Sequence, residues 1–135
     1  MEFLSSESFF KNLDYQAAAG GEDNYLQFIR VRPVILEMVS KVFKVSTRDI
    51  LAKSRSQAHI AFARQVAMYL THICCGLNLT ETGRLFNRDR TTVAYACNLV
   101  EDRRDETKFD LTLELLEKTI SEFALKPREE FNYAL

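Results

Sequence analysis

With 135 residues, 47% of them hydrophobic, the chain suits one domain with a modest core. It has no apolar run of about 18 residues, so we expect no membrane-spanning helix. The net charge of −1 hides a basic centre: residues 30–105 hold thirteen Lys/Arg and seven Asp/Glu, whereas both flanks are acidic. This pattern favours a local anion-binding surface, although an ordinary charged surface would also explain it.

The cysteines and histidines form no recognisable site. Cys74, Cys75 and Cys97 lack the even count of a disulfide framework and the spacing of metal ligands, so we expect buried thiols in a reducing cytoplasm. His59 and His72 have no partner at catalytic or ligand spacing, and we expect both to be structural or solvent-facing. The sequence therefore predicts no metal, no cofactor and no enzyme.

Helical periodicity runs through the body of the chain, which predicts an all-α domain of about five or six helices. Residues 1–29 have weak periodicity and are expected to form a flexible N-terminal tail. Pro33 fits the first turn of the next helix, because its missing N–H has no helical partner there. The apolar residues that follow at helical spacing are Val34, Met38, Val39 and Val42.

Two further helices are predicted before residue 77. Ser46, with Asp49 three residues later, has the spacing of a capping box and predicts a short helix through Leu51. Residues 58–75 are the most periodic segment, and Gly76 should end it. Its predicted buried face contains Phe62, Ala63, Val66, Ala67, Leu70 and Ile73. The residues predicted to lie largely off that face are Arg64, Gln65, Met68 and Thr71.

The next two predicted helices are separated by a tight turn at Asn87. Thr80 is the expected cap of the first, a helix of about two turns whose inward residues are Leu79, Gly83 and Phe86. The second should start near Asp89 or Arg90, with a buried stripe of Val93, Ala96, Cys97 and Val100. Two short helices joined in this way describe a helix-turn-helix, whose second helix lies in the DNA major groove.

The residues at the start of the second helix have the chemistry that reads DNA. Arg88 and Arg90 can each donate two hydrogen bonds to guanine, Asp89 can accept from cytosine, and Thr91 and Thr92 can contact bases. The helix N-terminus also has free N–H groups that suit phosphate. Asp89 could instead be a plain N-cap, the arginines solvated charges and the threonines first-turn residues.

The last predicted helix covers residues 110–125, with Asp110 as cap and Pro127 after its end. Its expected buried face contains Leu113, Leu116, Ile120 and Phe123. We expect this face to pack on its own domain, although it could pair with a second copy. The expected organisation is a tail at 1–29, one domain at 30–125 and a second tail at 126–135.

Two stretches resemble the C-terminal DNA-binding domain of the bacterial replication initiator DnaA. They are RSQAHIAFARQVAMYL and LNLTETGRLFNRDRTTVAYAC, and the resemblance covers roughly residues 30–105. It implies an all-helical domain that binds double-stranded DNA at DnaA-box-like sites. It also implies that Arg88, Asp89, Thr91 and Thr92 contact bases or backbone in the major groove. Arg55 would enter the minor groove, and Arg64 and Gln65 would lie near phosphate.

The sequence departs from that family's pattern at several positions. Arg90 stands where the initiator usually has His, and the turn FNRD is one residue shorter than the usual FGGRD, so the preferred base sequence stays open. Thr82 stands where Ile is usual, which would weaken packing between the two helices. No GxxxxGK[ST] motif occurs, so we expect a small stand-alone relative without the nucleotide-binding part.

Two functions remain open at this point. The first is a sequence-specific DNA-binding protein, cytoplasmic and nucleoid-associated, that modulates replication initiation as a monomer or weak dimer. The second is a protein-interaction module that binds a replication-initiation regulator, or a transcription regulator that acts at other promoters. The acidic flanks, the short turn and Thr82 favour the second alternative.

Overall fold

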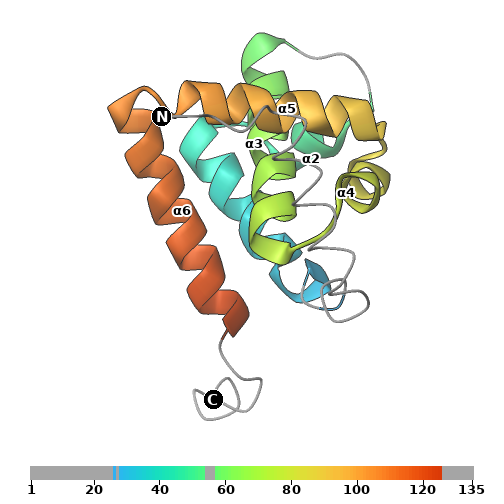
Figure 1. Ribbon diagram of the computed structural model, residues 1–135, viewed down its shortest axis with the longest axis horizontal. Helices are drawn as coiled ribbons and strands as arrows, with labels where there is room; N and C mark the ends of the chain where they lie inside the picture. Colours follow the sequence, from blue (N-terminus) through green and yellow to red (C-terminus); the bar gives the residue numbers. More distant parts are fainter. Residues whose placement is uncertain (1–25, 27, 54–56, 126–135) are drawn as a thin grey trace, which may run out of the picture.

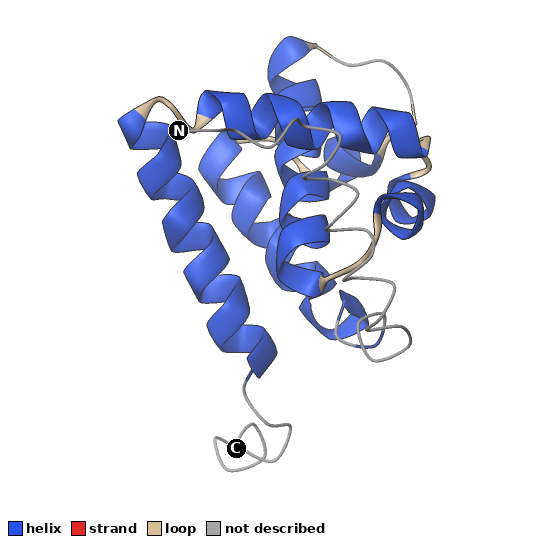
Figure 2. Ribbon diagram, viewed as in Figure 1, coloured by secondary structure: helices blue, strands red, loops and turns tan. Residues whose placement is uncertain are grey.

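The computed structural model describes residues 26, 28–53 and 57–125, and every regular element within these ranges is a helix (Figure 2). The all-α prediction is confirmed. A first helix covers residues 28–43. It is followed by α2 (Thr47–Leu51), α3 (Ala58–Cys75), α4 (Leu79–Phe86), α5 (Arg90–Arg103) and α6 (Thr107–Leu125). None of the described helices has the combination of length and apolar character needed to cross a membrane.

Helix α3 is the centre of the domain and contacts α2, α4, α5 and α6 (Figure 1). Because neighbours surround it, α3 is buried on more than the one face that its periodicity indicates. The prediction that Arg64, Met68 and Thr71 lie off the buried face is wrong, since all three side chains are buried. Gly76 ends the helix in the left-handed conformation with φ of 68°, as predicted.

The first helix begins earlier than the sequence suggested. Phe28 and Val31 are buried in the core, so the expected boundary between residues 29 and 30 falls inside a helix. Pro33 also lies within this helix rather than at its start, which deprives the carbonyl of Ile29 of its helical donor. Val39 is buried as predicted, whereas Val42 is 44% exposed. The early apolar residues stabilise a helix that Pro33 alone would have started later.

The caps of α2 and α4 come from local side chains. The hydroxyl of Ser46 accepts from the N–H of Asp49 at 3.1 Å, as predicted. At α4 the predicted cap, Thr80, is wrong. Asn78 accepts from the N–H of Glu81 at 2.8 Å, and the Glu81 carboxylate accepts from the N–H of Asn78 at 3.1 Å. The cap of α4 is therefore Asn78, two residues before Thr80, and the helix begins at Leu79.

The last helix packs on its own domain. Leu113, Leu116 and Ile120 are buried as predicted, and Phe123 is half-buried. These residues of α6 therefore pack within the chain itself, as expected. Asp110 is not the cap, because α6 begins at Thr107 and places Asp110 in its first turn. Pro127 lies outside the described residues.

Two of the three cysteines and one of the two histidines are buried. Cys75 and Cys97 are buried and Cys74 is half-buried, and none of the three forms a disulfide with another described residue. Burial raises the pKa of the Cys75 thiol to about 12, so it stays protonated and weakly nucleophilic near neutral pH. His72 is buried and donates from Nδ1 to the carbonyl of Leu77 at 2.5 Å. His59 is exposed.

A polar network around Arg104 joins α3, α5 and α6. Its guanidinium donates to the Asp110 carboxylate at 2.6 Å, to the Tyr69 hydroxyl at 3.0 Å, and to Glu117. Tyr69 in turn donates to Glu101. Burial and this hydrogen bond raise the pKa of the Tyr69 hydroxyl far above its usual value, so it remains a donor. The side chain of Arg104 is only 17% exposed, and its loss leaves the partly buried carboxylates of Asp110 and Glu117 without this donor.

Arg104→Met should therefore lower the free energy of unfolding by about 2–4 kcal/mol, because two carboxylates lose a partly buried cation. Urea denaturation monitored by circular dichroism measures this change. Arg32→Met, which removes an exposed arginine of the first helix, is the matched control and should change stability by less than about 0.5 kcal/mol. Equal effects of the two substitutions would contradict the role assigned to the network.

Thr82 lies in α4 with no exposed surface, and its hydroxyl oxygen has no hydrogen-bond partner among the described residues. A buried hydroxyl that makes no hydrogen bond costs about 1–3 kcal/mol. The sequence led us to expect weaker packing at this position; what the structure shows is a buried hydroxyl.

Thr82→Val should raise the free energy of unfolding by about 1 kcal/mol, since valine keeps the shape and removes the unsatisfied hydroxyl. Thr80→Val makes the same chemical change at an exposed position of α4 and should be close to neutral. Thermal and urea unfolding of both variants test the prediction. A destabilised Thr82→Val protein would show that the hydroxyl is satisfied in solution.

Candidate nucleic-acid interface

Helices α4 and α5 are joined by the predicted tight turn. Asn87 adopts the left-handed conformation, with φ of 57°, that asparagine tolerates better than most residues. The N–H of Arg88 then donates to the carbonyl of Gly83 at 2.7 Å. A Cβ atom at Gly83 would lie 2.3 Å from the carbonyl oxygen of Arg88, so only glycine lets the turn pass this close to α4. The turn is thus held in one place relative to α4.

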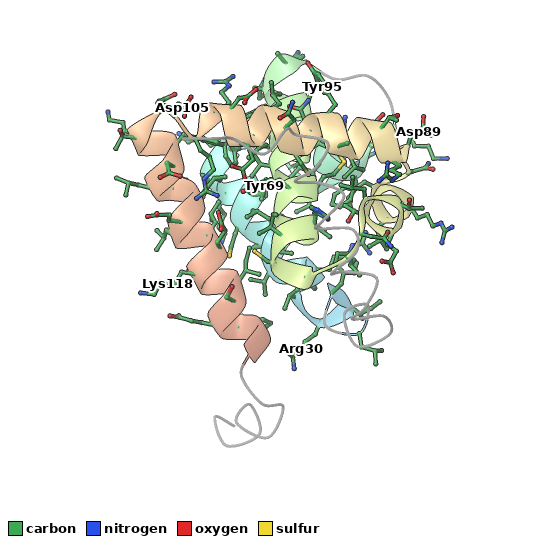
Figure 3. All side chains as sticks on the ribbon, in the orientation of Figure 1. Arg30, Tyr69, Asp89, Tyr95, Asp105 and Lys118 are labelled. Carbon is green, nitrogen blue, oxygen red and sulfur yellow. The ribbon has the colours of Figure 1, made fainter. Side chains whose placement is uncertain are left out.

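Helix α5 is buried along the predicted stripe and exposed at its N-terminal end. Val93, Ala96, Cys97 and Val100 are all buried, which confirms the stripe. The exposed residues at the start of the helix are Asp89, Arg90, Thr91 and Thr92. Figure 3 shows Asp89 at the end of α5 that lies beside α4, directed away from the core. Four residues whose side chains can contact base edges are therefore grouped at one exposed helix end.

Asp89 occupies the N-cap position of α5, but its side chain makes no capping hydrogen bond. The sequence allowed Asp89 to be a plain N-cap or a residue that contacts DNA. Its backbone does occupy the N-cap position, but its carboxylate does not cap the helix. The carboxylate remains exposed on the surface that the following three residues form. It is placed to accept a hydrogen bond from an external donor.

Tyr95 belongs to the same exposed surface and was not singled out from the sequence. Its side chain is 64% exposed and lies on the outward side of α5 in Figure 3. It follows Thr91 by four residues and Thr92 by three, so the three side chains share one helical face. This spacing is visible in the sequence, but the resemblance to the DnaA domain implied major-groove contacts only for Arg88, Asp89, Thr91 and Thr92. The candidate surface therefore extends one turn beyond Thr92.

Arg88 is placed differently from the expectation that it reads a base. The side chain is half-buried, and its guanidinium donates to the carbonyls of Phe86 and Asn87, both at 3.1 Å. It also donates to the carbonyls of Ala52 and Lys53, at 3.0 and 3.4 Å. These four acceptors hold the guanidinium against the end of α2 rather than at the exposed end of α5.

Arg64 is also turned inward, and the expected contact with phosphate is not supported by its placement. Only 6% of the residue is exposed, and its guanidinium donates to the carbonyls of Ile50 and Asp49, both at 2.8 Å. Burial and the nearby charge of Arg88 lower the pKa of Arg64. Gln65 is half-buried beside it. Arg55 lies outside the described residues.

The comparisons with known proteins agree with this geometry. The family model "Bacterial dnaA protein helix-turn-helix" matches residues 33–100, which include the first helix from Pro33 and most of α5. It describes a helix-turn-helix domain and not a catalytic one. The matched range ends before α6.

Individual relatives point the same way. The chain is 41% identical over 90 residues to the chromosomal replication initiator protein DnaA of Lachnoclostridium phytofermentans. It is 44% identical over 80 residues to that of Clavibacter sepedonicus. These matches cover 65% and 55% of this chain but 20% and 17% of the relatives. The chain thus spans about a fifth of the length of the initiators that it matches.

A solved structure, "Crystal structure of DNA replication initiation factor", is 31% identical with a TM-score of 0.63. It covers 86% of this chain, which covers 36% of that one. The described helix-turn-helix, the matched model and these relatives agree with the resemblance seen in the sequence. The chain belongs to the family of bacterial DnaA helix-turn-helix domains.

Proposed function

We propose that this protein binds double-stranded DNA at DnaA-box-like sites and thereby modulates the initiation of chromosome replication. The observation that carries the proposal is the exposed N-terminal end of α5, where Asp89, Arg90, Thr91 and Thr92 stand together on a firmly held turn. In a helix-turn-helix the corresponding end of the second helix faces the base edges in the major groove.

Each exposed residue has a chemical role in this proposal. Arg90 donates to guanine N7 and O6, and Asp89 accepts from the amino group of cytosine. Thr91 and Thr92 contact a base or pack a methyl group on thymine. Because Arg90 replaces the His that is usual in the family, the preferred site differs from that of the initiator at the base pair that Arg90 contacts.

The contacts outside the major groove remain part of the proposal. Arg55 follows the end of α2 in sequence. In this proposal its side chain enters the minor groove, which arginine side chains often contact. Gln65, half-buried on α3, lies near a backbone phosphate. The basic centre of residues 30–105 supplies the sequence-independent attraction to the phosphates. The protein would act as a monomer or weak dimer in the cytoplasm, on the nucleoid.

A second candidate function is suggested by the outer face of α6. Leu111 and Leu115 are 58% and 65% exposed and lie one helical turn apart, on a helix outside the range matched by the family model. Exposed leucines on one helical face are compatible with a protein partner, such as a regulator of replication initiation. A pull-down after nuclease treatment distinguishes the two functions, because partners bridged by DNA are then lost.

Binding to a labelled duplex with a DnaA box, and to a scrambled duplex of equal composition, tests the main proposal. The box should bind more tightly, and Thr92→Ala should weaken box binding by about 1–3 kcal/mol while relaxing specificity at the contacted base pair. Thr119→Ala, the same change at an exposed position of α6, is the control and should bind as wild type. Equal binding of both duplexes, with Thr92→Ala harmless, would refute the proposal.

A further inference from the structure

The end of α2 receives two arginines from different parts of the chain. Arg64 donates to the carbonyls of Asp49 and Ile50 from α3, and Arg88 donates to those of Ala52 and Lys53 from the turn before α5. The last carbonyls of a helix have no partner within the helix, and they carry the negative end of its dipole. Two guanidinium groups therefore take carbonyls of the last turn of α2, at Asp49 and Ile50, and of the two residues just after the helix, Ala52 and Lys53.

Arg88 also forms hydrogen bonds to the residues just before it, at the end of α4. The guanidinium that donates to the carbonyls after α2 also donates to the carbonyls of Phe86 and Asn87, at the end of α4. The backbone N–H of Arg88 donates to Gly83, so both the main chain and the side chain of this residue are held. Arg88 thus joins α2, α4 and the start of α5 through one residue.

We propose that Arg88 is a positioning residue of the DNA-binding surface and does not itself read a base. By holding the turn against the end of α2, it sets where Asp89 and the following residues of α5 stand. This inference rests on the proposed DNA binding. It assigns to Arg88 a role different from the contact with bases or DNA backbone that the resemblance to the DnaA domain implies.

The chemistry of arginine fits this role better than that of lysine. A guanidinium is planar and has five donors, so it can reach carbonyls of two segments at once. A lysine ammonium is a compact charge with three donors on a flexible stem. Arg88→Lys therefore keeps the charge but loses the simultaneous contacts to α2 and to the turn.

Salt dependence separates a positioning residue from one that contacts DNA. A residue that neutralises a phosphate contributes about one unit to the slope of log affinity against log salt concentration, and its removal lowers that slope. A residue that acts through the turn changes the affinity at every salt concentration alike. Arg90, two residues later and exposed, offers the matched control, since Arg90→Ala removes the same charge from the reading end itself.

The experiment compares Arg88→Ala, Arg88→Lys and Arg90→Ala with wild type on the box and scrambled duplexes, across a salt series. We expect Arg88→Ala and Arg88→Lys to lose roughly tenfold or more in affinity for the box, with specificity reduced across the site and the salt slope unchanged. Arg90→Ala should lower the slope or relax one base position. Wild-type affinity of Arg88→Lys, a reduced slope for Arg88→Ala, or relaxed specificity at one base pair would overturn the inference.

Amide hydrogen exchange tests the same contacts without DNA. In Arg88→Lys, we expect the N–H groups of the turn, including that of Arg88 bonded to Gly83, to exchange at least about tenfold faster than in wild type. In Arg90→Ala they should exchange as in wild type. Unchanged exchange in Arg88→Lys would overturn the inference. If wild type does not distinguish the two duplexes, the proposed function fails, whereas the exchange result still decides whether Arg88 holds the turn.

Discussion

The burial of α3 among four other helices is the constraint on which the rest of the structure depends. A helix surrounded in this way must satisfy its polar side chains inside the protein, because water does not reach them. Arg64 does so on the carbonyls at the end of α2, and Tyr69 does so on Glu101 of α5. The polar residues of α3 thereby tie the outer helices to the centre at defined places.

The exposed N-terminal end of α5 is held in place by contacts on the buried side of the helix. The apolar stripe from Val93 to Val100 fixes the rotation of the helix, because a different rotation would expose that stripe. Gly83 and Arg88 fix the position of its first turn. The far end of α5 is tied to α6 through Arg104, which follows directly after the helix. A firmly held helix presents short side chains such as Thr91 more accurately than a mobile loop would.

Most of the helices and the helix-turn-helix were predictable because their signals are local. Apolar spacing in α5, the Ser46 cap and the glycine after α3 each depend on residues within one or two turns. The wrong cap of α4 was a local error, because the capping box of Asn78 and Glu81 lies within one turn, but the other main errors come from long-range packing. The first helix starts before Pro33 because Phe28 packs in the core. Met68 is buried because α3 has neighbours on several sides. Neither fact has a signature within a local window of sequence.

The sequence by itself determined the helical class, the turn at Asn87 and the grouping of Asp89, Arg90, Thr91 and Thr92 at one helix start, since periodicity and residue chemistry are properties of short segments. Only the tertiary structure divided the arginines by role. Arg90 is left on the exposed end of α5, whereas Arg64 and Arg88 are drawn to the carbonyls of α2. The physical reason is that a guanidinium can donate either to DNA or to peptide carbonyls. Which acceptor it meets depends on a helix that lies many residues away in the chain.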